Sequence, residues 1–519
     1  MGKSEKDLDP MDAIIDLDDA LQDGDIHLRD KYQFELKSEY TPVAEHTNTH
    51  SAEFYIFIPG ALRINRHTYS KEDFYQDQTN LIRFKTPEVA LSDLANSTFK
   101  HSPLNRIRAL YRGDHSKLSK KVLKEMKVYA NITRSGIRDR CNQIIDELKH
   151  KKNGTPGKEI ERDVELLCSH TQSLRQSFLS FMEEFRPRWE GTRLLEYSRY
   201  IDEFISNTVE RYFTPILAEL RQPSHSDLNS AQECVKQRIL WEQHHRKESE
   251  EYSPWAEDPE KAMEYAIYRQ SLLRKFVWEV LFLDITRVDA ARPFLQFAAA
   301  IAAGLAMLLY VYFFIAWQGS IIITDSTAFI ILSVGLYVIK DRLKEGIRNG
   351  SSTLASKWFP DYKTRIHSPD QEAVIGTITE YVSFLRKKQV PDELLEVRNT
   401  RFHTELERAR RIETVLYFKK QVTLYPRITW AQGTLTELND IFRYNISRFL
   451  RKASDAYEEQ MQLDGETGEL KKMKAPKVYH VNILMKNIYE DSKGSMHEEL
   501  RKYRLVLDKE GIKRIEKVL

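Results

Sequence analysis

The sequence predicts an α-rich α+β membrane protein, and three observations support this fold class. Residues 294–317 form a run of 24 residues without a charged side chain. The N-terminal flank repeats apolar residues at three- and four-residue steps, which is typical of amphipathic helices. The C-terminal flank alternates short β-rich runs with charged segments. We therefore expect a two-helix transmembrane hairpin between an N-terminal β-module plus coiled-coil-like helical bundle and a C-terminal α+β domain.

The predicted hairpin comes from two successive apolar runs. As a helix, residues 294–317 would extend roughly 36 Å, which exceeds the ~30 Å hydrocarbon core of a bilayer. A second apolar run covers residues 320–339, interrupted by Asp325. We place transmembrane helices at 294–317 and 326–344 and a short external loop at 318–325. Asp325 then caps the second helix from the loop, or it lies inside the span as an intramembrane carboxylate.

Basic residues near both ends of the hairpin predict its orientation. They are Arg269, Arg274, Lys275, Arg287 and Arg292 before it, and Lys340, Arg342, Lys344, Arg348 and Lys357 after it. The loop at 318–325 contains neither Lys nor Arg. The positive-inside rule therefore predicts a two-span protein with both termini cytoplasmic. A bacterial inner (plasma) membrane is the simplest location.

Small residues recur along the predicted spans at helical spacing. They are Ala298, Ala302, Gly304 and Ala306 in the first span and Gly335 in the second. Small side chains allow helix backbones to approach closely in lipid. We expect this stripe to pack the two helices of the hairpin together, or to form a homo-oligomer through the same face.

Composition limits the function classes that fit the chain. The 519 residues predict three or four structural units at ~150 residues each. Lys and Arg (79) nearly balance Asp and Glu (77), so a dedicated nucleic-acid-binding protein is not expected. The three cysteines, Cys141, Cys168 and Cys234, form no CxxC pattern, which argues against a disulfide framework or a thiolate zinc site. Cys141 and Cys168 lie on apolar helix faces and are interpreted as core residues.

The chain begins with an acidic segment and a β-containing module. Residues 1–30 contain ten acidic and three basic residues, and we predict a disordered tail. Residues 31–103 show strand-like alternation at Tyr32, Phe34 and Leu36, with further β-rich runs at 54–58 and 81–84. The aromatic residues Tyr69, Phe74 and Tyr75 could contact a ligand, but core packing is the preferred interpretation.

Residues 104–291 predict a helical bundle. Apolar faces over 118–148 and 160–185 flank a turn at 153–157, which indicates an antiparallel helical hairpin. Further helices are expected at 194–213, 226–252 and 259–290, the last leading into the membrane. The first helix is basic, with eleven basic and four acidic residues over 117–152. Its basic face is interpreted as solvated or as a contact for anionic lipid head groups. The residues concerned are Lys117, Lys120, Lys121, Lys124, Lys127, Arg134 and Arg138.

Residues 345–519 predict a C-terminal α+β domain. Strands are expected at 414–424, 478–485 and 503–507, and helices at 391–411 and 435–452. Residues 373–385 fit either a strand or a helix, and their β-branched residues favour the strand. Asp464-Gly465 lies between two short runs at 458–463 and 470–474, which is a β-hairpin signature. Because both flanks are predicted to face one compartment, the N-terminal β-module is expected to pack against this domain.

No familiar catalytic motif occurs in the sequence: the phosphate loop, the dinucleotide turn, the nucleophile elbow and the HExxH pattern are all missing. Glu242 and His245 form one ExxH pair, but a di-iron site needs two, so we interpret both residues as surface charge. We assign no catalytic, cofactor-binding or metal-binding residue. The expected function is a non-enzymatic, membrane-anchored scaffold, assembly factor or signalling adaptor, with the lipid bilayer and other proteins as partners. The alternatives are an unfamiliar enzyme in the C-terminal domain and a subunit of an oligomeric pore or transporter.

Overall fold

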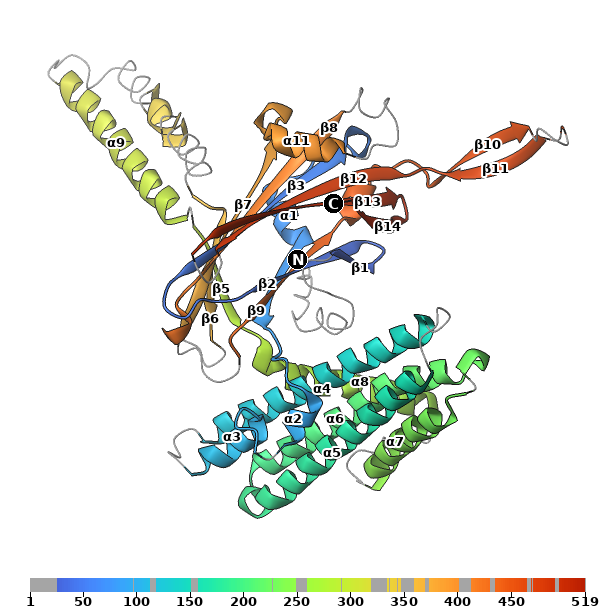
Figure 1. The fold of residues 1–519 in the computed structure, drawn as a ribbon. Coiled ribbons are helices and arrows are strands. Elements are labelled where there is room, and N and C mark those ends of the chain that lie inside the picture. Colours follow the sequence, from blue (N-terminus) through green and yellow to red (C-terminus); the bar gives the residue numbers. More distant parts are fainter. Residues whose placement is uncertain are drawn as a thin grey trace.

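The computed structural model describes residues 26–96, 98–112, 118–150, 157–225, 227–248, 259–290, 292–318, 334–335, 337–342, 344–346, 359–368, 373–400, 412–429, 435–463, 468, 470–490 and 494–518. These residues form a β domain, a helical bundle beneath it, and a long helix that projects from the β domain (Figure 1). The strands are β1 (Ile26–Asp30), β2 (Gln33–Tyr40), β3 (Asn48–Pro59), β4 (Gln78–Phe84), β5 (Asp284–Asp289), β6 (Tyr362–His367), β7 (Val374–Leu385), β8 (Glu413–Leu424), β9 (Leu438–Asn445), β10 (Tyr457–Leu463), β11 (Leu470–Pro476), β12 (Tyr479–Glu490), β13 (Met496–Asp508) and β14 (Gly511–Lys517). The helices are α1 (Lys71–Asp77), α2 (Leu91–Ala95), α3 (Pro103–Leu110), α4 (Leu118–His150), α5 (Gly157–Trp189), α6 (Arg193–Leu220), α7 (Asn229–Glu248), α8 (Pro259–Trp278), α9 (Arg292–Gln318), α11 (Asp392–Asn399) and α13 (Ser447–Leu450).

The larger sheet of the β domain has eight strands in the order β14-β13-β12-β3-β8-β7-β6-β5. Strand β3 comes from the N-terminal part of the chain and pairs antiparallel with β8 and β12 from the C-terminal part. Its apolar run from Phe54 to Ile58 is buried throughout, as expected for a strand in the middle of a sheet. The expectation that the N-terminal β-module packs against the C-terminal domain is therefore confirmed, and the two share one sheet.

The smaller sheet has four strands in the order β1-β2-β9-β4, and it packs on the larger sheet through aromatic side chains. Phe442 of β9 lies 4.9 Å from Phe54 and 5.5 Å from Phe418 between ring centroids. Tyr69, Phe74 and Tyr75 are buried in or beside this core, so their interpretation as packing residues is confirmed. Offset aromatic contacts of this kind add roughly 0.5–1.5 kcal/mol per pair beyond the burial of area.

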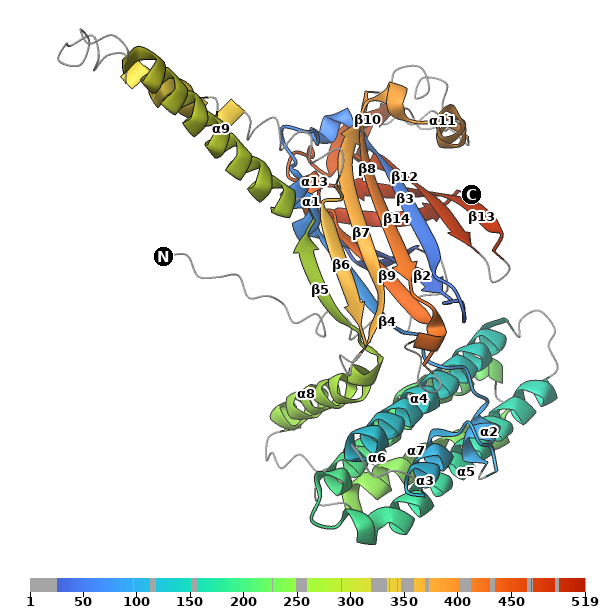
Figure 2. The same cartoon turned by 90° about the vertical axis from the view of Figure 1, so that its left-hand side faces the viewer.

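The helical bundle contains α2 to α8, and it lies below the β domain (Figure 2). The predicted antiparallel hairpin is confirmed as α4 and α5, whose apolar faces are buried against each other and against α6. The same apolar core continues into the lower end of the β domain, where Leu81 and Ile82 of β4 and Ile378 of β7 join it. Bundle and β domain are thus connected by a shared core.

The predicted membrane hairpin is wrong. A membrane span requires length, apolar character and very few charges to coincide in one helix. Among the residues that the structure describes, no helix combines them to the extent needed to cross a bilayer. Helix α9 covers the first proposed span at 294–317, and Asp325 lies outside the described residues. This finding contradicts the membrane fold class and the inner-membrane location with cytoplasmic domains. It also contradicts the proposed spans at 294–317 and 326–344 with their external loop at 318–325. The membrane-anchored and pore functions, which depend on these spans, are wrong as well.

Four further predictions differ from the structure. Residues 435–452 are not one helix but β9 followed by α13; β9 is buried on both faces, so its apolar residues do not alternate. The expected helix at 259–290 ends at Trp278, and β5 follows and pairs with β6. Helix α6 continues past Pro215 to Leu220, because Ile216 and Leu220 are buried in the bundle. The acidic tail was expected to reach residue 30, but β1 begins at Ile26, and residues 1–25 lie outside the described range.

A glycine in β7 offers a test of the close pairing in the larger sheet. A Cβ at Gly376 would lie 2.3 Å from the Thr423 carbonyl oxygen and 3.2 Å from the Leu424 Cα, both on the backbone of β8. We expect Gly376→Ala to lower the free energy of unfolding by about 1–3 kcal/mol, because β8 must move to admit the methyl group. Urea denaturation measures this change.

Gly304→Ala in α9 is the matched control, since nothing lies within 4 Å of a Cβ at that position. It removes a glycine from a helix interior and is expected to be neutral or stabilising by up to ~1 kcal/mol. If the two variants unfolded at the same urea concentration as the wild type, the tight β7–β8 pairing would be incorrect.

Candidate functional site

A cleft of about 810 Å³ opens at the lower end of the β domain. Its walls come from the end of β2 and the segment that follows, from the start of β3, and from the adjoining parts of β12 and β13. This volume is in the range of sites that enclose a drug-sized small molecule. The cleft is therefore large enough to be a ligand site, and its lining decides which ligand would fit.

One wall of the cleft is formed by part of a row of stacked Tyr and His rings. Tyr489 of β12 is directly opposite His50 of β3 and His497 of β13 in the strand register, so the three side chains share one face of the sheet. The centroid distances are 6.4 Å from Tyr489 to His50 and 5.5 Å from Tyr489 to His497, with interplanar angles of 16° and 25°. Tyr40 of β2 extends the row, 4.8 Å from the His50 ring. Tyr489 is 37% exposed, which leaves ring surface available to a ligand.

Behind this wall, a buried ion pair ties the two sheets together. The Lys420 Nζ of β8 donates to the Asp440 Oδ1 of β9 at 2.6 Å, and the Tyr40 hydroxyl donates to Asp440 Oδ2 at 2.9 Å. Lys420 and Asp440 are almost fully buried. Burial, together with the Asp440 carboxylate, raises the pKa of Tyr40. Tyr40 therefore stays a neutral donor, and its ring is held in place at the edge of the cleft.

His50 is held as a neutral imidazole with one nitrogen already occupied. The Asn48 amide nitrogen lies 3.3 Å from the Thr41 carbonyl oxygen, which only accepts, so this atom is the NH₂ group. The same NH₂ lies 2.9 Å from His50 Nε2, which must then accept. The ring proton consequently lies on Nδ1, which becomes a donor. Burial lowers the pKa of His50 to about 4, so the imidazole is uncharged at neutral pH.

Charges line the cleft, and most of them are paired. The Arg501 Nε donates to Glu499 at 2.7 Å, and Glu39 forms ion pairs with Lys37 and Lys85, both at 2.8 Å. Arg427 differs: its backbone N–H donates to the Val43 carbonyl oxygen at 2.9 Å, but no side-chain hydrogen bond or ion pair of its guanidinium occurs within the described part of the chain. Arg427 thus adds a half-buried positive charge that an anionic ligand could neutralise.

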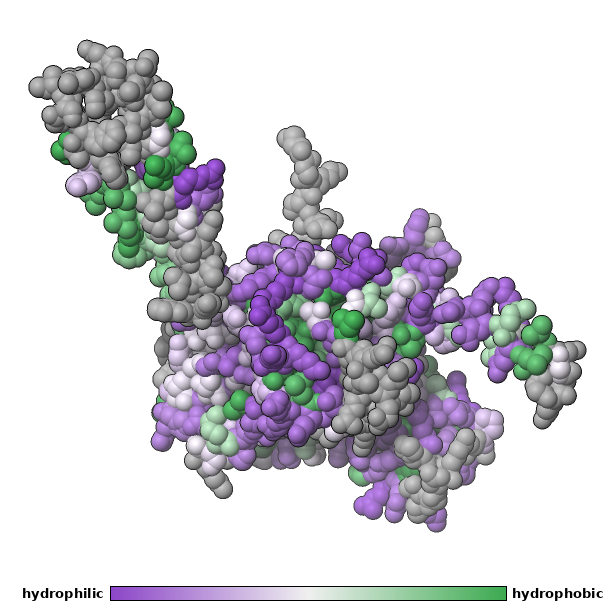
Figure 3. Space-filling view, turned by 90° about the horizontal axis from the view of Figure 1, so that it is seen from above, coloured by the Kyte–Doolittle hydropathy of each residue, from purple (hydrophilic) through white to green (hydrophobic). Residues whose placement is uncertain are grey.

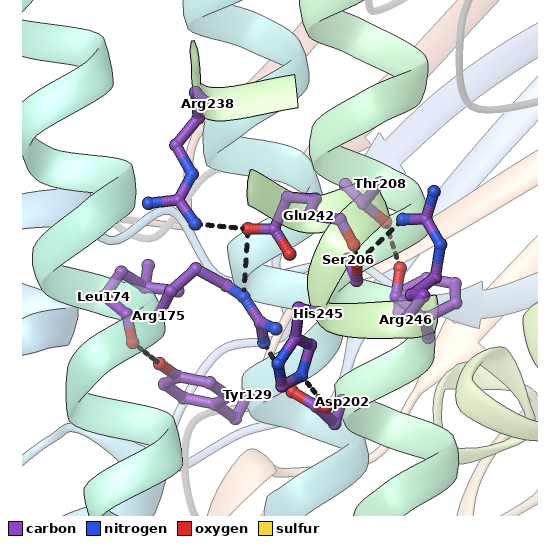
Figure 4. A network of polar contacts seen from close by, with 11 residues as sticks. Tyr129, Leu174, Arg175, Asp202, Ser206, Thr208, Arg238, Glu242, His245 and Arg246 are labelled. Carbon is purple, nitrogen blue, oxygen red and sulfur yellow. Dashed lines mark hydrogen bonds and ion pairs between the residues drawn. The ribbon is translucent and has the colours of Figure 1, made fainter. Parts of the chain in front are cut away.

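A second polar cluster lies inside the helical bundle (Figure 4). Arg175 of α5 is fully buried, and its guanidinium donates to Asp202 of α6 at 2.6 Å and to Glu242 of α7 at 3.1 Å. Arg238 reaches the same Glu242 oxygen at 2.8 Å. Burial alone would raise the pKa of Asp202, but Arg175 and His245 together hold it below its usual value. The cluster joins three helices, and its charged side chains pair with one another, so we regard it as structural.

This cluster corrects the interpretation of the ExxH pair. Glu242 is fully buried and contacts two arginines, and His245 lies 2.8 Å from the Asp202 carboxylate and stacks on Trp241. Surface charge was therefore the wrong interpretation. The i, i+3 spacing turns both side chains toward the neighbouring helices, as for a metal ligand pair, but Glu242 contacts Arg175 of α5 and His245 contacts Asp202 of α6. Among the described residues, no group of three or more His, Cys, Asp or Glu side chains could hold a metal ion.

The basic residues of α4 do not share one surface. Lys127 and Arg134 are buried, with their cations over the rings of Phe276 at 4.1 Å and Trp278 at 4.7 Å. Lys120 and Lys121 are exposed, Lys124 and Arg138 are half-buried, and Lys117 lies outside the described residues. The set proposed to contact lipid head groups is thus divided between the interior of the bundle and its surface.

The small-residue stripe of α9 is also divided. Ala302 and Ala306 are buried and Ala298 is half-buried on one face of the helix, whereas Gly304 and Gly335 are exposed. Cys141 and Cys168 are buried in the bundle, which confirms their interpretation as core residues, and Cys234 is half-buried.

Sequence reasoning did not identify the cleft. Its residues come from five separate segments, and only the strand register brings Tyr489 beside His50. The one local signal is the placement of Asn48 and His50 just before the apolar run of β3. No protein-family model, curated protein or solved structure matches the chain.

The bundle cluster generates a stability prediction. Arg175→Met removes the cation and leaves Asp202 and Glu242 buried without it, so we expect a loss of about 3–5 kcal/mol in the free energy of unfolding of the bundle. Arg140→Gln is the control: Arg140 pairs with Asp163 at 2.7 Å across α4 and α5, but both side chains are about one-third exposed. That pair should contribute less than ~1 kcal/mol. Helical circular dichroism in urea compares the variants, and equal effects would contradict the structural role of Arg175.

The neutral state of His50 generates a pH prediction. Its folded pKa of about 4 lies below the ~6.5 of an unfolded histidine, so between these values the unfolded chain binds the additional proton. Stability is therefore unaffected by His50 above pH ~6.5 and falls as the pH decreases toward 4. Relative to His50→Gln, the wild type should lose about 1.5 kcal/mol between pH ~6.5 and ~5. Denaturant titrations at each pH measure this difference, and an NMR titration that placed the His50 pKa near 6.5 would refute it.

Proposed function

We propose that this protein binds a small anionic ligand with a planar ring in the cleft of the β domain. The observation that carries the proposal is the combination of Arg427, whose guanidinium has no charged partner among the described residues, with a stacked-ring wall in a single cleft of ligand size. A carboxylate or a similar anion would pair with Arg427. The ring of the ligand would lie against Tyr489 and His50.

Three properties of the site support this ligand class over others. The His50 Nδ1 supplies a neutral donor, which can hydrogen-bond an anion without adding a titrating charge near neutral pH. Tyr40 and His50 are positioned by buried partners, Asp440 and Asn48, so little side-chain entropy is lost on binding. Glu39 and Glu499 are already paired with cations, so their charges would oppose an anionic ligand only weakly.

The experiment uses 2-naphthoate and its neutral counterpart 2-naphthylmethanol, measured by isothermal titration calorimetry with the full-length protein. We expect 2-naphthoate to bind the wild type, and Arg427→Gln to weaken its binding by at least about tenfold, since a charge-assisted hydrogen bond contributes roughly 1.5–3 kcal/mol. Binding of the alcohol should be the same in both proteins, because it lacks the charge that Arg427 recognises.

Arg365→Gln is the matched control, because Arg365 is an exposed arginine of β6 in the same domain that does not line the cleft. It should leave the affinity for 2-naphthoate unchanged. No saturable binding of 2-naphthoate up to millimolar concentration would overturn the proposal, and so would equal affinities of the wild type and Arg427→Gln.

A further inference from the structure

Strands β10 and β11 form a two-stranded arm that extends away from the β domain (Figure 1). The register pairs Tyr457 with Pro476 at its base and Leu463 with Leu470 toward its tip. Every residue of β10 is exposed, and apolar side chains contribute to this exposure, among them Met461 at 67% and Leu463 at 62%. Seen from above, apolar residues gather toward the end of the arm (Figure 3). An isolated hairpin of this kind is only marginally stable in water without a further partner.

The two edges of the arm differ in how they can accept another strand. The outer edge of β11 contains Pro476, which has no N–H, together with Lys472 and Lys474. Proline and lysine on an edge are the usual protection against strand addition. The sequence of β10, YEEQMQL, contains neither residue. The outer edge of β10 is therefore the one open to pairing.

The sequence of β10 also matches itself in the antiparallel direction. With Gln460 on a two-fold axis, Tyr457 lies opposite Leu463 of the second copy, Glu458 opposite Gln462, and Glu459 opposite Met461. No like charges face each other, and each aromatic residue meets an aliphatic one, which favours cross-strand pairing. The same operation on β11, centred on Met473, would place Lys472 opposite Lys474. The β10 edge therefore fits a two-fold contact without opposed like charges, whereas β11 in the equivalent register does not.

We propose that the arm is a homodimerisation element in which β10 pairs antiparallel with β10 of a second copy. The contact joins the two hairpins into one four-stranded sheet. Since directly opposed residues share a face, Tyr457, Met461, Leu463 and Leu470 of both copies lie on the same side of that sheet. Glu459 on this face is neutralised within its own hairpin by Lys472 at 2.5 Å. The contact is isologous, so it closes at two copies.

The test places charges on the two-fold axis of the full-length protein. Gln460→Lys brings two lysines together and Gln460→Glu brings two glutamates together, so each variant alone should dimerise at least about tenfold more weakly than the wild type. Mixing the two variants should restore a heterodimer, because a lysine then faces a glutamate. Sedimentation velocity and native mass spectrometry of chains with different tags measure both effects.

Met473→Lys is the matched control: Met473 is directly opposite Gln460 in the hairpin, so the same charge is added to the other strand of the arm. This variant should remain dimeric. A wild type that stays monomeric at all concentrations would overturn the proposal. An oligomer that is insensitive to both charges at position 460 would overturn it as well, because another surface would then hold the copies together. The ligand measurements on the cleft are independent of this outcome.

Discussion

The pairing of β3 with β8 and β12 is the constraint on which the structure depends. It joins residues 48–59 to residues 413–424 and 482–489, and thereby closes a loop of several hundred residues that contains the whole helical bundle and α9. Closing a longer loop adds only slowly to the entropic cost, so a large insertion between paired strands is tolerated. The same pairing brings Asn48 and His50 beside Tyr489. Without β3 in its central position there is neither a common core nor a cleft.

Buried charges then determine how the layers fit. Lys420 with Asp440 joins the two sheets, and Arg175 with Asp202 and Glu242 joins three helices of the bundle. Such pairs contribute little net stability, because removing both charges from water offsets their attraction. A misplaced sheet or helix, however, would leave one charge buried alone, which is far more costly. We infer that these clusters mainly select one packing arrangement over alternative arrangements. Their net contribution to the stability of that arrangement is small.

The sequence predicts those elements whose pattern depends on local surroundings. The α4–α5 hairpin, β7, β8 and the β10–β11 arm follow from helical spacing, alternation and a turn at Asp464-Gly465, since each has one buried and one exposed face or a clear turn signal. Prediction from the sequence fails where tertiary structure removes the contrast between a buried and an exposed face. The apolar residues of β9 are buried on both faces and resemble a helix, and Glu242 resembles a surface residue until Arg175 is placed beside it. The cleft depends on strand register over long sequence separations, which no local pattern contains.

Strand β12 connects the two proposed sites. It begins at Tyr479, just after β11 of the arm, and ends at Glu490 in the wall of the cleft. Its twelve residues extend roughly 40 Å. Because β3 and β13 hold it on both sides, its ends are fixed relative to each other. A dimer formed through β10 would contain two clefts related by the two-fold axis. Ligand binding at Tyr489 of β12 and self-association at Gln460 of β10 would then use separate surfaces, without competing for the same residues.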